Sequence, residues 1–205
     1  MPRLISCVIV IIVLVASASS PALGQERRWN FDDDPLGFIA RGFTAGSGTW
    51  SVVSSDSGNS FAQSARNVEG VLNIALVDDS SARDLDLSVR MKPVAGEFDQ
   101  GGGLVWRACD KRNYYLCRYN PLDDNFRLYK VVEGTKSLLQ NADVGKTPGW
   151  HSIGVAMTSD HIECFLDGKK LLVHDDPSLR AAGKIGVWTK ADAQSQFDDL
   201  SFVAR

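Results

Sequence analysis

Two acidic residues near the middle of the sequence have a spacing that could support hydrolysis of a glycosidic bond. Glu97 and Asp99 are two residues apart, so on a β-strand their side chains would lie on the same face. Glycosidases need two carboxyl groups beside the bond, about 5 Å apart when the anomeric configuration is retained. The pattern Glu-x-Asp-x-x-Glu adds a third acid, but Gly102 stands in that position here. Because glycine has no side chain to move a proton, we interpret Glu97 and Asp99 as loop acids.

Other catalytic patterns are missing from the sequence. His151, His161 and His174 do not have the spacing of a metal-binding pair, and no serine lies in a Gly-x-Ser-x-Gly motif. Three consecutive glycines, residues 101–103, are expected to open a strand rather than a helix, which argues against a phosphate site. We therefore predict no cofactor.

Neighbouring acids offer an alternative site, because calcium prefers carboxylate oxygens. Such acids occur in four places that we expect to be loops or strand ends: residues 32–34, 123–124, 175–176 and 198–199. Solvated acids in turns are the commoner arrangement, and a structural calcium ion is the alternative that this pattern leaves open.

The chain has the pattern of an all-β protein. Residues 85–91 alternate apolar and polar side chains, which is typical of a strand with one face in the core. Asp167-Gly168 separates two apolar runs, a strong signal for a β-hairpin. Further strands are expected at 50–53, 72–77, 103–108, 114–120, 125–132, 150–157, 162–166, 170–173, 185–190 and 197–203, with an edge strand and a loop within 29–37 and one helical turn at 177–182. This even spacing predicts a two-sheet antiparallel sandwich or jelly roll.

The strand expected at 114–120 carries aromatic residues on both faces, so one face should meet something other than the core. Aromatic rings stack on the apolar faces of sugars, and arginine and asparagine supply several hydrogen bonds to hydroxyl groups. The candidate ligand-binding residues on this strand and its neighbours are Arg107, Arg118, Asn120, Trp188 and Lys190. The alternative is that a second layer or a loop covers this face and the same side chains are ordinary packing.

The first 24 residues have the pattern of a secretory signal peptide. A positive start at Arg3 precedes an apolar run at 4–16, and the small residues Ala22 and Gly24 precede the expected cleavage site. The apolar run is shorter than the roughly 20 residues of a membrane-spanning helix. We therefore expect cleavage without membrane anchoring, a secreted or periplasmic location, and one domain over residues 25–205.

Charge and cysteine content narrow the function further. The sequence holds 22 basic and 25 acidic side chains, so nucleic acid is not an expected partner. Cys7 lies in the expected signal segment. The three cysteines that remain after cleavage, Cys109, Cys117 and Cys164, match no zinc-site spacing and allow at most one disulfide. Buried free thiols are the simpler interpretation, because a domain of this size does not need disulfides for stability.

Several segments together resemble the concanavalin A-like and laminin G-like jelly rolls of secreted bacterial proteins: residues 99–107, 113–115, 124–131, 150–151, 165–170 and 186–192. The nearest subgroup is similar to the domain known as 3-keto-disaccharide hydrolase. The resemblance implies a jelly roll over most of the chain and a glycan or sugar-derived ligand on the concave sheet. It does not place family catalytic residues in this sequence.

Three functions are consistent with these observations. The first is a secreted, lectin-like carbohydrate-binding module, which needs no catalytic pair. The second is a glycoside hydrolase of the 3-keto-disaccharide type, in which Glu97 or Asp99 would act with a base from another strand. The third is a protein–protein adhesion domain, which an exposed apolar patch at the rim would favour.

Overall fold

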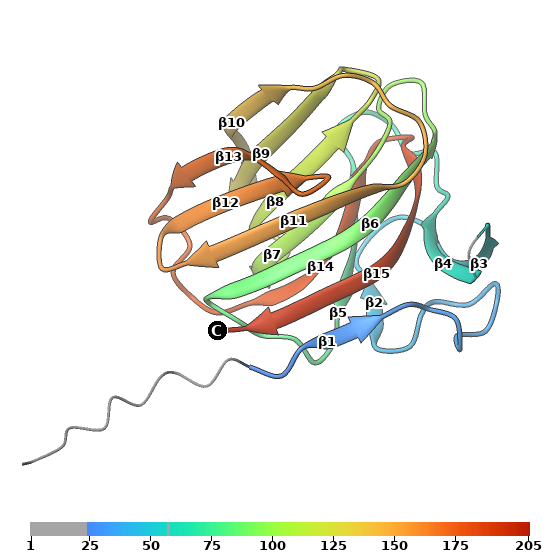
Figure 1. Cartoon of the computed structure of the whole chain (residues 1–205), viewed down its shortest axis with the longest axis horizontal. Helices are drawn as coiled ribbons and strands as arrows, with labels where there is room; N and C mark the ends of the chain where they lie inside the picture. The colour runs from blue at the N-terminus through green and yellow to red at the C-terminus, as the bar shows by residue number, and fades with distance from the viewer. Residues whose placement is uncertain (1–23, 57) are drawn as a thin grey trace, which may run out of the picture.

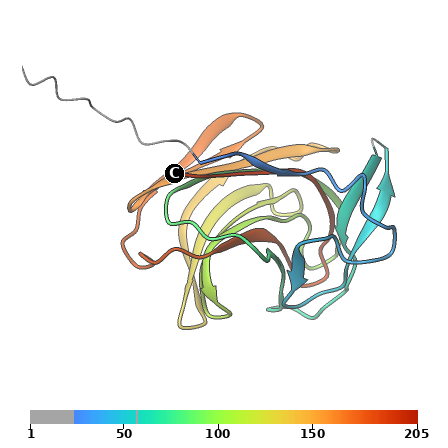
Figure 2. The same cartoon turned by 90° about the horizontal axis from the view of Figure 1, so that it is seen from below.

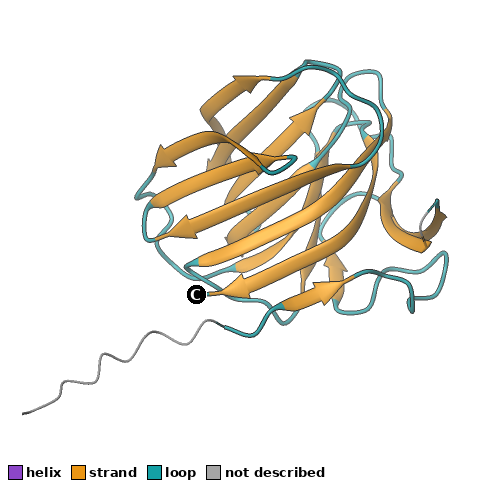
Figure 3. Cartoon of the chain, in the orientation of Figure 1, coloured by secondary structure: helices purple, strands orange, loops and turns teal. Residues whose placement is uncertain are grey.

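The computed structural model describes residues 24–56 and 58–205, so the predicted signal segment lies outside the described residues except for Gly24. The described chain consists of strands and loops (Figure 3). Fifteen strands are formed: β1 Arg27–Trp29, β2 Phe43–Ala45, β3 Trp50–Ser55, β4 Gly58–Gln63, β5 Leu72–Val77, β6 Leu85–Ala95, β7 Gly103–Asp110, β8 Asn113–Asn120, β9 Asn125–Val132, β10 Thr135–Asp143, β11 His151–Thr158, β12 His161–Leu166, β13 Lys169–Asp175, β14 Lys184–Lys190 and β15 Gln194–Ala204.

The strands form two antiparallel sheets packed face to face (Figures 1 and 2). One has eight strands in the order β13-β12-β11-β6-β15-β4-β3, with β1 paired to β15. The other has seven, in the order β10-β9-β8-β7-β14-β5-β2. The predicted two-sheet antiparallel sandwich is therefore confirmed.

Alternating side chains from both sheets fill the space between them. On β6, Leu85, Leu87 and Val89 point inward, while the residues between them are only partly buried. The seven-stranded sheet meets this layer with Trp106 and Tyr115, whose rings stack 5.6 Å apart. The alternation read from the sequence therefore matches the side of each strand that forms the core.

Three strands differ from the sequence-based expectation. No strand was expected at β10, because its Thr-Lys-Ser-Leu-Leu-Gln sequence lacks clean alternation, and the register with β9 shifts between Leu138 and Gln140. Strands β2 and β4 were also not expected, since β2 is short and β4 mixes glycine and polar residues with its apolar ones. The helical turn expected at 177–182 is instead an irregular loop.

The seven-stranded sheet is strongly curved, and its outward side carries a second apolar cluster separate from the core (Figure 2). We call this side the concave face. Its buried members are Val105, Ala108, Tyr114, Leu116, Tyr129, Val131 and Trp188, with Leu72, Ile74 and Leu76 packed against them.

Both ends of the described chain lie on the eight-stranded sheet. The amide N–H of Gly24 donates to the carbonyl of Ala204 at 3.0 Å, and β1 continues this pairing along β15. Figure 2 shows the two ends on the side of the molecule away from the concave face. Within the described residues, the structure contains no helix with the length and hydropathy needed to cross a membrane.

Candidate ligand-binding face

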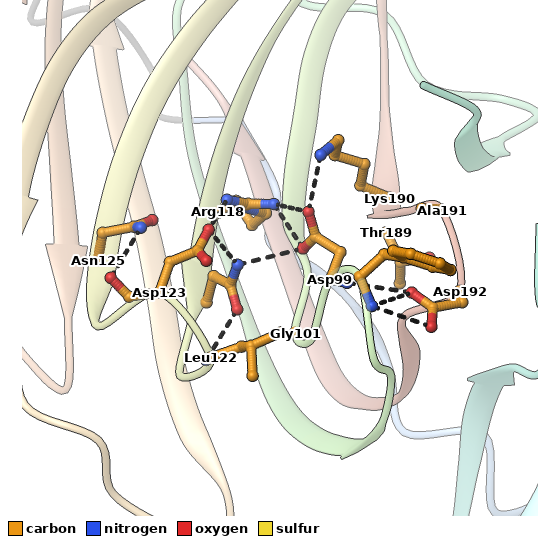
Figure 4. A network of polar contacts seen from close by, with 12 residues as sticks. Asp99, Gly101, Arg118, Leu122, Asp123, Asn125, Thr189, Lys190, Ala191 and Asp192 are labelled. Carbon is orange, nitrogen blue, oxygen red and sulfur yellow. Dashed lines mark hydrogen bonds and ion pairs between the residues drawn. The ribbon is translucent and has the colours of Figure 1, made fainter. Parts of the chain in front are cut away.

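A buried ion-pair cluster centred on Asp99 lies at one end of the concave face (Figure 4). Both carboxylate oxygens of Asp99 accept hydrogen bonds from Nη1 of Arg118, and Nζ of Lys190 lies 3.1 Å from Oδ2. The side chains of Asp99 and Arg118 are almost fully buried, whereas that of Lys190 is 20% exposed. Lys190 is therefore the member of this trio that reaches solvent.

Asn120 connects this cluster to the turn between β8 and β9. Its amide nitrogen donates to Oδ2 of Asp123 at 2.8 Å and, more weakly, to Oδ1 of Asp99 at 3.3 Å. Its oxygen accepts the backbone N–H of Leu122 at 2.9 Å. Asp123 is half-exposed and also lies 3.5 Å from Nη2 of Arg118, so it brings a second carboxylate to the edge of the cluster.

The loop before β7 is held in place by Asp192. The Asp192 carboxylate accepts the backbone N–H groups of Glu97, Phe98 and Asp99, at 2.6, 3.2 and 3.0 Å. Desolvation alone would raise the pKa of Asp192, but these backbone hydrogen bonds outweigh it and lower the pKa below its ordinary value. The loop therefore presents Asp99 to the concave face in one fixed position.

Trp188 forms the floor of the concave face. It lies directly opposite Gly103 in the β14–β7 register, and its indole N–H crosses to β8, where it donates to the carbonyl of Cys117 at 2.8 Å. A Cβ atom on Gly103 would stand 2.1 Å from that same carbonyl oxygen, so only glycine fits there. The rings of Tyr129 and Trp188 are perpendicular to each other, with centroids 6.5 Å apart.

Basic side chains continue the face over β9 and β10. Arg127 lies directly opposite Arg118 in the register, and its Nε donates to Oδ1 of Asn141 at 2.8 Å. Lys136 is exposed and places its ammonium group 5.0 Å from the centroid of the Tyr129 ring. The face thus combines aromatic, basic and amide side chains from β8, β9 and β10.

A groove of about 660 Å³ extends the concave face across β5, β7 and β14. Leu72, Ile74, Leu76 and Val105 provide an apolar floor. Polar side chains stand around it, among them Thr44, Ser47, Ser81, Asp110, Lys111 and Lys184. An apolar floor with scattered polar groups around it is the usual composition of a small-molecule site.

The five candidate residues from the sequence have different positions. Arg118, Asn120 and Lys190 are brought together around Asp99. Trp188 is on the same face but fully buried, and its N–H is used within the sheet. It therefore supports the face from below.

Arg107 does not join the other four. Its side chain is fully buried at the opposite end of the sheet and donates to the carbonyls of Arg83, Leu179 and Ser159. Alternation from Val105 predicts that the Arg107 side chain lies on the concave face. However, Arg107 has a positive φ of 47°, and the β7–β8 register shifts between Trp106 and Asp110. The bulge reverses the alternation, so that Ala108 takes the concave position.

The two acids considered first also separate. Glu97 is exposed on its loop, as expected of a loop acid, whereas Asp99 is 1% exposed at the centre of the ion-pair cluster. The sequence analysis did not place Asp99 with Arg118, nor did it identify Arg127, Tyr129 and Lys136. The alternation of β9 could have found Arg127 and Tyr129, because they lie directly opposite Arg118 and Leu116.

The remaining sequence-based candidates are distributed over other parts of the sandwich. Within residues 24–56 and 58–205, no group of three or more His, Cys, Asp or Glu side chains is arranged to hold a metal ion. Cys109 is exposed, Cys117 and Cys164 are buried, and all three are free thiols. Nδ1 of His151 lies 2.8 Å from Asp167, and its ring packs on Tyr119, which indicates a structural role.

Similarity to solved structures supports the fold assignment. No protein-family model and no curated protein sequence matches the chain. Among solved structures, a carbohydrate-binding module, CBM66, from Bacillus subtilis aligns with a TM-score of 0.66 and 20% identity over 78% of this chain and 94% of that one.

Two further structures align over most of their own length. A Bacillus subtilis protein of unknown function with a galectin-like fold has a TM-score of 0.60 and 13% identity, covering 80% of this chain and 90% of that chain. Domain 4 of AbnA, an extracellular GH43 arabinanase from Geobacillus stearothermophilus solved with arabinotriose, has a TM-score of 0.57 and 13% identity, covering 86% and 90%. The chain is thus similar to these proteins in fold: an all-β, two-sheet antiparallel sandwich of the galectin-like and concanavalin A-like type.

Proposed function

We propose that the protein is a carbohydrate-binding module that holds a glycan on its concave face. The observation that carries this proposal is the composition of that face: Lys190, held by the buried cluster of Asp99, Arg118 and Asn120, reaches solvent beside an apolar groove. Sugars have apolar ring faces and many hydroxyl groups, so their binding needs both features side by side. The fold similarity to a carbohydrate-binding module and to a domain solved with arabinotriose supports the same proposal.

The preorganisation of the cluster favours binding. Asp192 fixes the loop of Asp99, and Asp99 in turn orients Arg118 and Lys190. Side chains that are already ordered lose little conformational entropy when a ligand arrives. The predicted signal segment would deliver the domain to the cell exterior or periplasm, where polysaccharides are available.

Affinity electrophoresis on native gels containing arabinan, xylan, β-glucan or polygalacturonate tests this function. The wild-type chain is expected to be retarded by at least one polysaccharide. Lys190→Gln should weaken the retardation about ten-fold, because it removes a charged donor from the face. Lys169→Gln, at an exposed residue of the β12–β13 hairpin in the other sheet, is the matched control. Absence of retardation on every polysaccharide would contradict the proposal.

A hydrolase of the 3-keto-disaccharide type is the second candidate, favoured by one observation. Asp99 and Asp123 lie on either side of the Asn120 amide, so two carboxylates occupy the same end of the concave face. Both are engaged with Arg118, which fits a binding role better than proton transfer. Incubation with 3-keto-disaccharides and glucans distinguishes the two functions: a binding module releases no reducing sugar, and turnover abolished by Asp123→Asn would establish the hydrolase.

A protein-adhesion function would use another surface. Leu36 and Phe38, in the segment between β1 and β2, are 54% and 67% exposed. If adhesion were the function, Phe38→Ser would reduce partner binding while leaving glycan retention unchanged.

A further inference from the structure

The concave face carries more positively charged side chains than its ion pairs neutralise. Arg118 and Lys190 share the buried carboxylate of Asp99. Among the residues that the structure describes, Arg127 and Lys136 form no ion pair, although they lie on the same face. Other acids nearby include Asp123, in the turn between β8 and β9, and Asp143, which lies at the end of β10 and accepts a hydrogen bond from Asn141.

The positive charges of these side chains repel one another. Arg118 and Arg127 are directly opposite each other on β8 and β9, a like-charge pairing that destabilises a sheet. Desolvation in the hollow lowers the pKa of Lys136, and the charges of Lys190 and Arg118 lower it further. A negatively charged group bound between β8 and β10 would relieve this repulsion.

Two buried polar atoms on the same strands also lack a partner. Nε of Arg118 and Oδ1 of Asn125 are inaccessible to solvent and make no hydrogen bond within the described chain. Arg118 and Asn125 are 2% and 1% exposed, respectively. An unpaired buried donor or acceptor costs free energy, so such atoms often mark a place where a ligand or a water molecule supplies the missing bond.

We propose that the ligand of the concave face is an acidic glycan, one that carries carboxylate or sulfate groups, with the acid group between Arg127 and Lys136. This inference rests on the proposed function and specifies its ligand class. Guanidinium and ammonium groups make charge-assisted hydrogen bonds to such anions, and Tyr129 lies between the two cations along the face.

Matched polysaccharides test the inference. Binding of the chain to polygalacturonate, alginate and glucuronoxylan is measured by isothermal titration calorimetry, and each polymer is compared with its carboxyl-reduced, neutral form. At least one acidic polymer is expected to bind about ten-fold more tightly than its neutral form. This preference should shrink when the salt concentration rises from about 50 mM to about 500 mM, because salt screens exposed charges.

Variants assign the effect to the two free cations. Arg127→Gln and Lys136→Gln should each weaken binding of the acidic form several-fold more than binding of its neutral form, whereas the control Lys169→Gln should change neither. Circular dichroism and thermal unfolding confirm that each variant is folded.

The possible outcomes separate the two proposals. Equal binding of acidic and neutral forms would overturn the acidic-ligand inference and leave the carbohydrate-binding function standing. Binding of no polysaccharide would overturn both. Equally tight binding to polyglutamate would show a general affinity for polyanions and would also overturn the inference.

Discussion

At the scale of single residues, Asp99 determines whether the concave face is ordered. A buried carboxylate is tolerated only when cations and hydrogen bonds compensate its lost hydration. Arg118, Lys190 and Asn120 provide that compensation, and they depend on Asp99 in return. The cluster therefore behaves as one unit in which each residue fixes the others.

Replacing Asp99 by asparagine should destabilise the protein. Asp99→Asn leaves Arg118 buried without its carboxylate partner, and we expect the free energy of unfolding to fall by about 3 kcal/mol. Asp123→Asn, on the half-exposed partner of the same arginine, should cost less than about 1 kcal/mol. Urea unfolding followed by tryptophan fluorescence compares the two variants. Equal losses in the free energy of unfolding would show that burial of the carboxylate does not determine the size of the loss.

A second buried carboxylate, Asp176, should make stability depend on pH. Desolvation alone would raise the pKa of Asp176, but hydrogen bonds from Lys130, Ser178 and Tyr115 lower it from 3.8 to about 2. A lowered folded-state pKa contributes stability above the unfolded pKa, and this stability is lost as the pH falls through the folded value.

The difference between the two pKa values of Asp176 corresponds to about 2 kcal/mol. This part of the stability should be present at pH 7 and lost between about pH 5 and pH 2. Urea unfolding at several pH values should show the gap between wild type and Asp176→Asn narrowing by that amount as the pH falls. A gap that stays constant with pH would contradict the assignment.

At the scale of elements, a glycine on β7 allows a tryptophan on β14 to form the floor of the site. Gly103 leaves the space through which the Trp188 indole reaches β8, so one strand lacks a side chain where its neighbour carries the largest one.

A methyl group at Gly103 should disrupt the floor of the concave face. In Gly103→Ala the new Cβ would stand 2.1 Å from the carbonyl oxygen of Cys117, which belongs to the backbone of the neighbouring strand. We expect a loss of about 3 kcal/mol in the free energy of unfolding and weaker glycan retention. Gly145→Ala is the control, because no atom lies within 4 Å of its added Cβ. Similar melting temperatures for the two variants would contradict this packing.

The elements also show what the sequence can and cannot predict. Regular alternation identified β6, and the Asp167-Gly168 signal identified the β12–β13 hairpin. Assigning alternate residues of β8 to two faces placed Arg118 and Asn120 on one face correctly. Alternation failed at Arg107, because a bulge inserts a residue that no local pattern announces. Alternation also could not predict the contact between Asp99 and Lys190. These residues are far apart in the sequence, and they meet because Asp192 fixes the loop that carries Asp99.

At the scale of the whole molecule, the two sheets bring two of the cysteines together in the core and leave the third at the surface. Cys117 on β8 and Cys164 on β12 come from opposite sheets and are buried in the same core cluster. Burial raises the pKa of the Cys164 thiol well above its ordinary value. Cys109 is exposed at the end of β7.

These positions predict stepwise thiol reactivity. In the folded protein, a disulfide reagent such as Ellman's reagent should react with Cys109 alone, and slowly at neutral pH, because burial and the neighbouring Asp110 raise its pKa. Cys117 and Cys164 should react only after unfolding in guanidinium chloride. In Cys109→Ser, reaction of the native protein would contradict this assignment of the thiols.

The pairing of Gly24 with Ala204 has a practical consequence for display of the domain. Because the two ends of the described chain meet on the eight-stranded sheet, a tag or a surface linker attached at either end leaves the opposite side of the molecule unobstructed. A biosensor that carries this domain through residue 205 would therefore turn its concave face toward the sample.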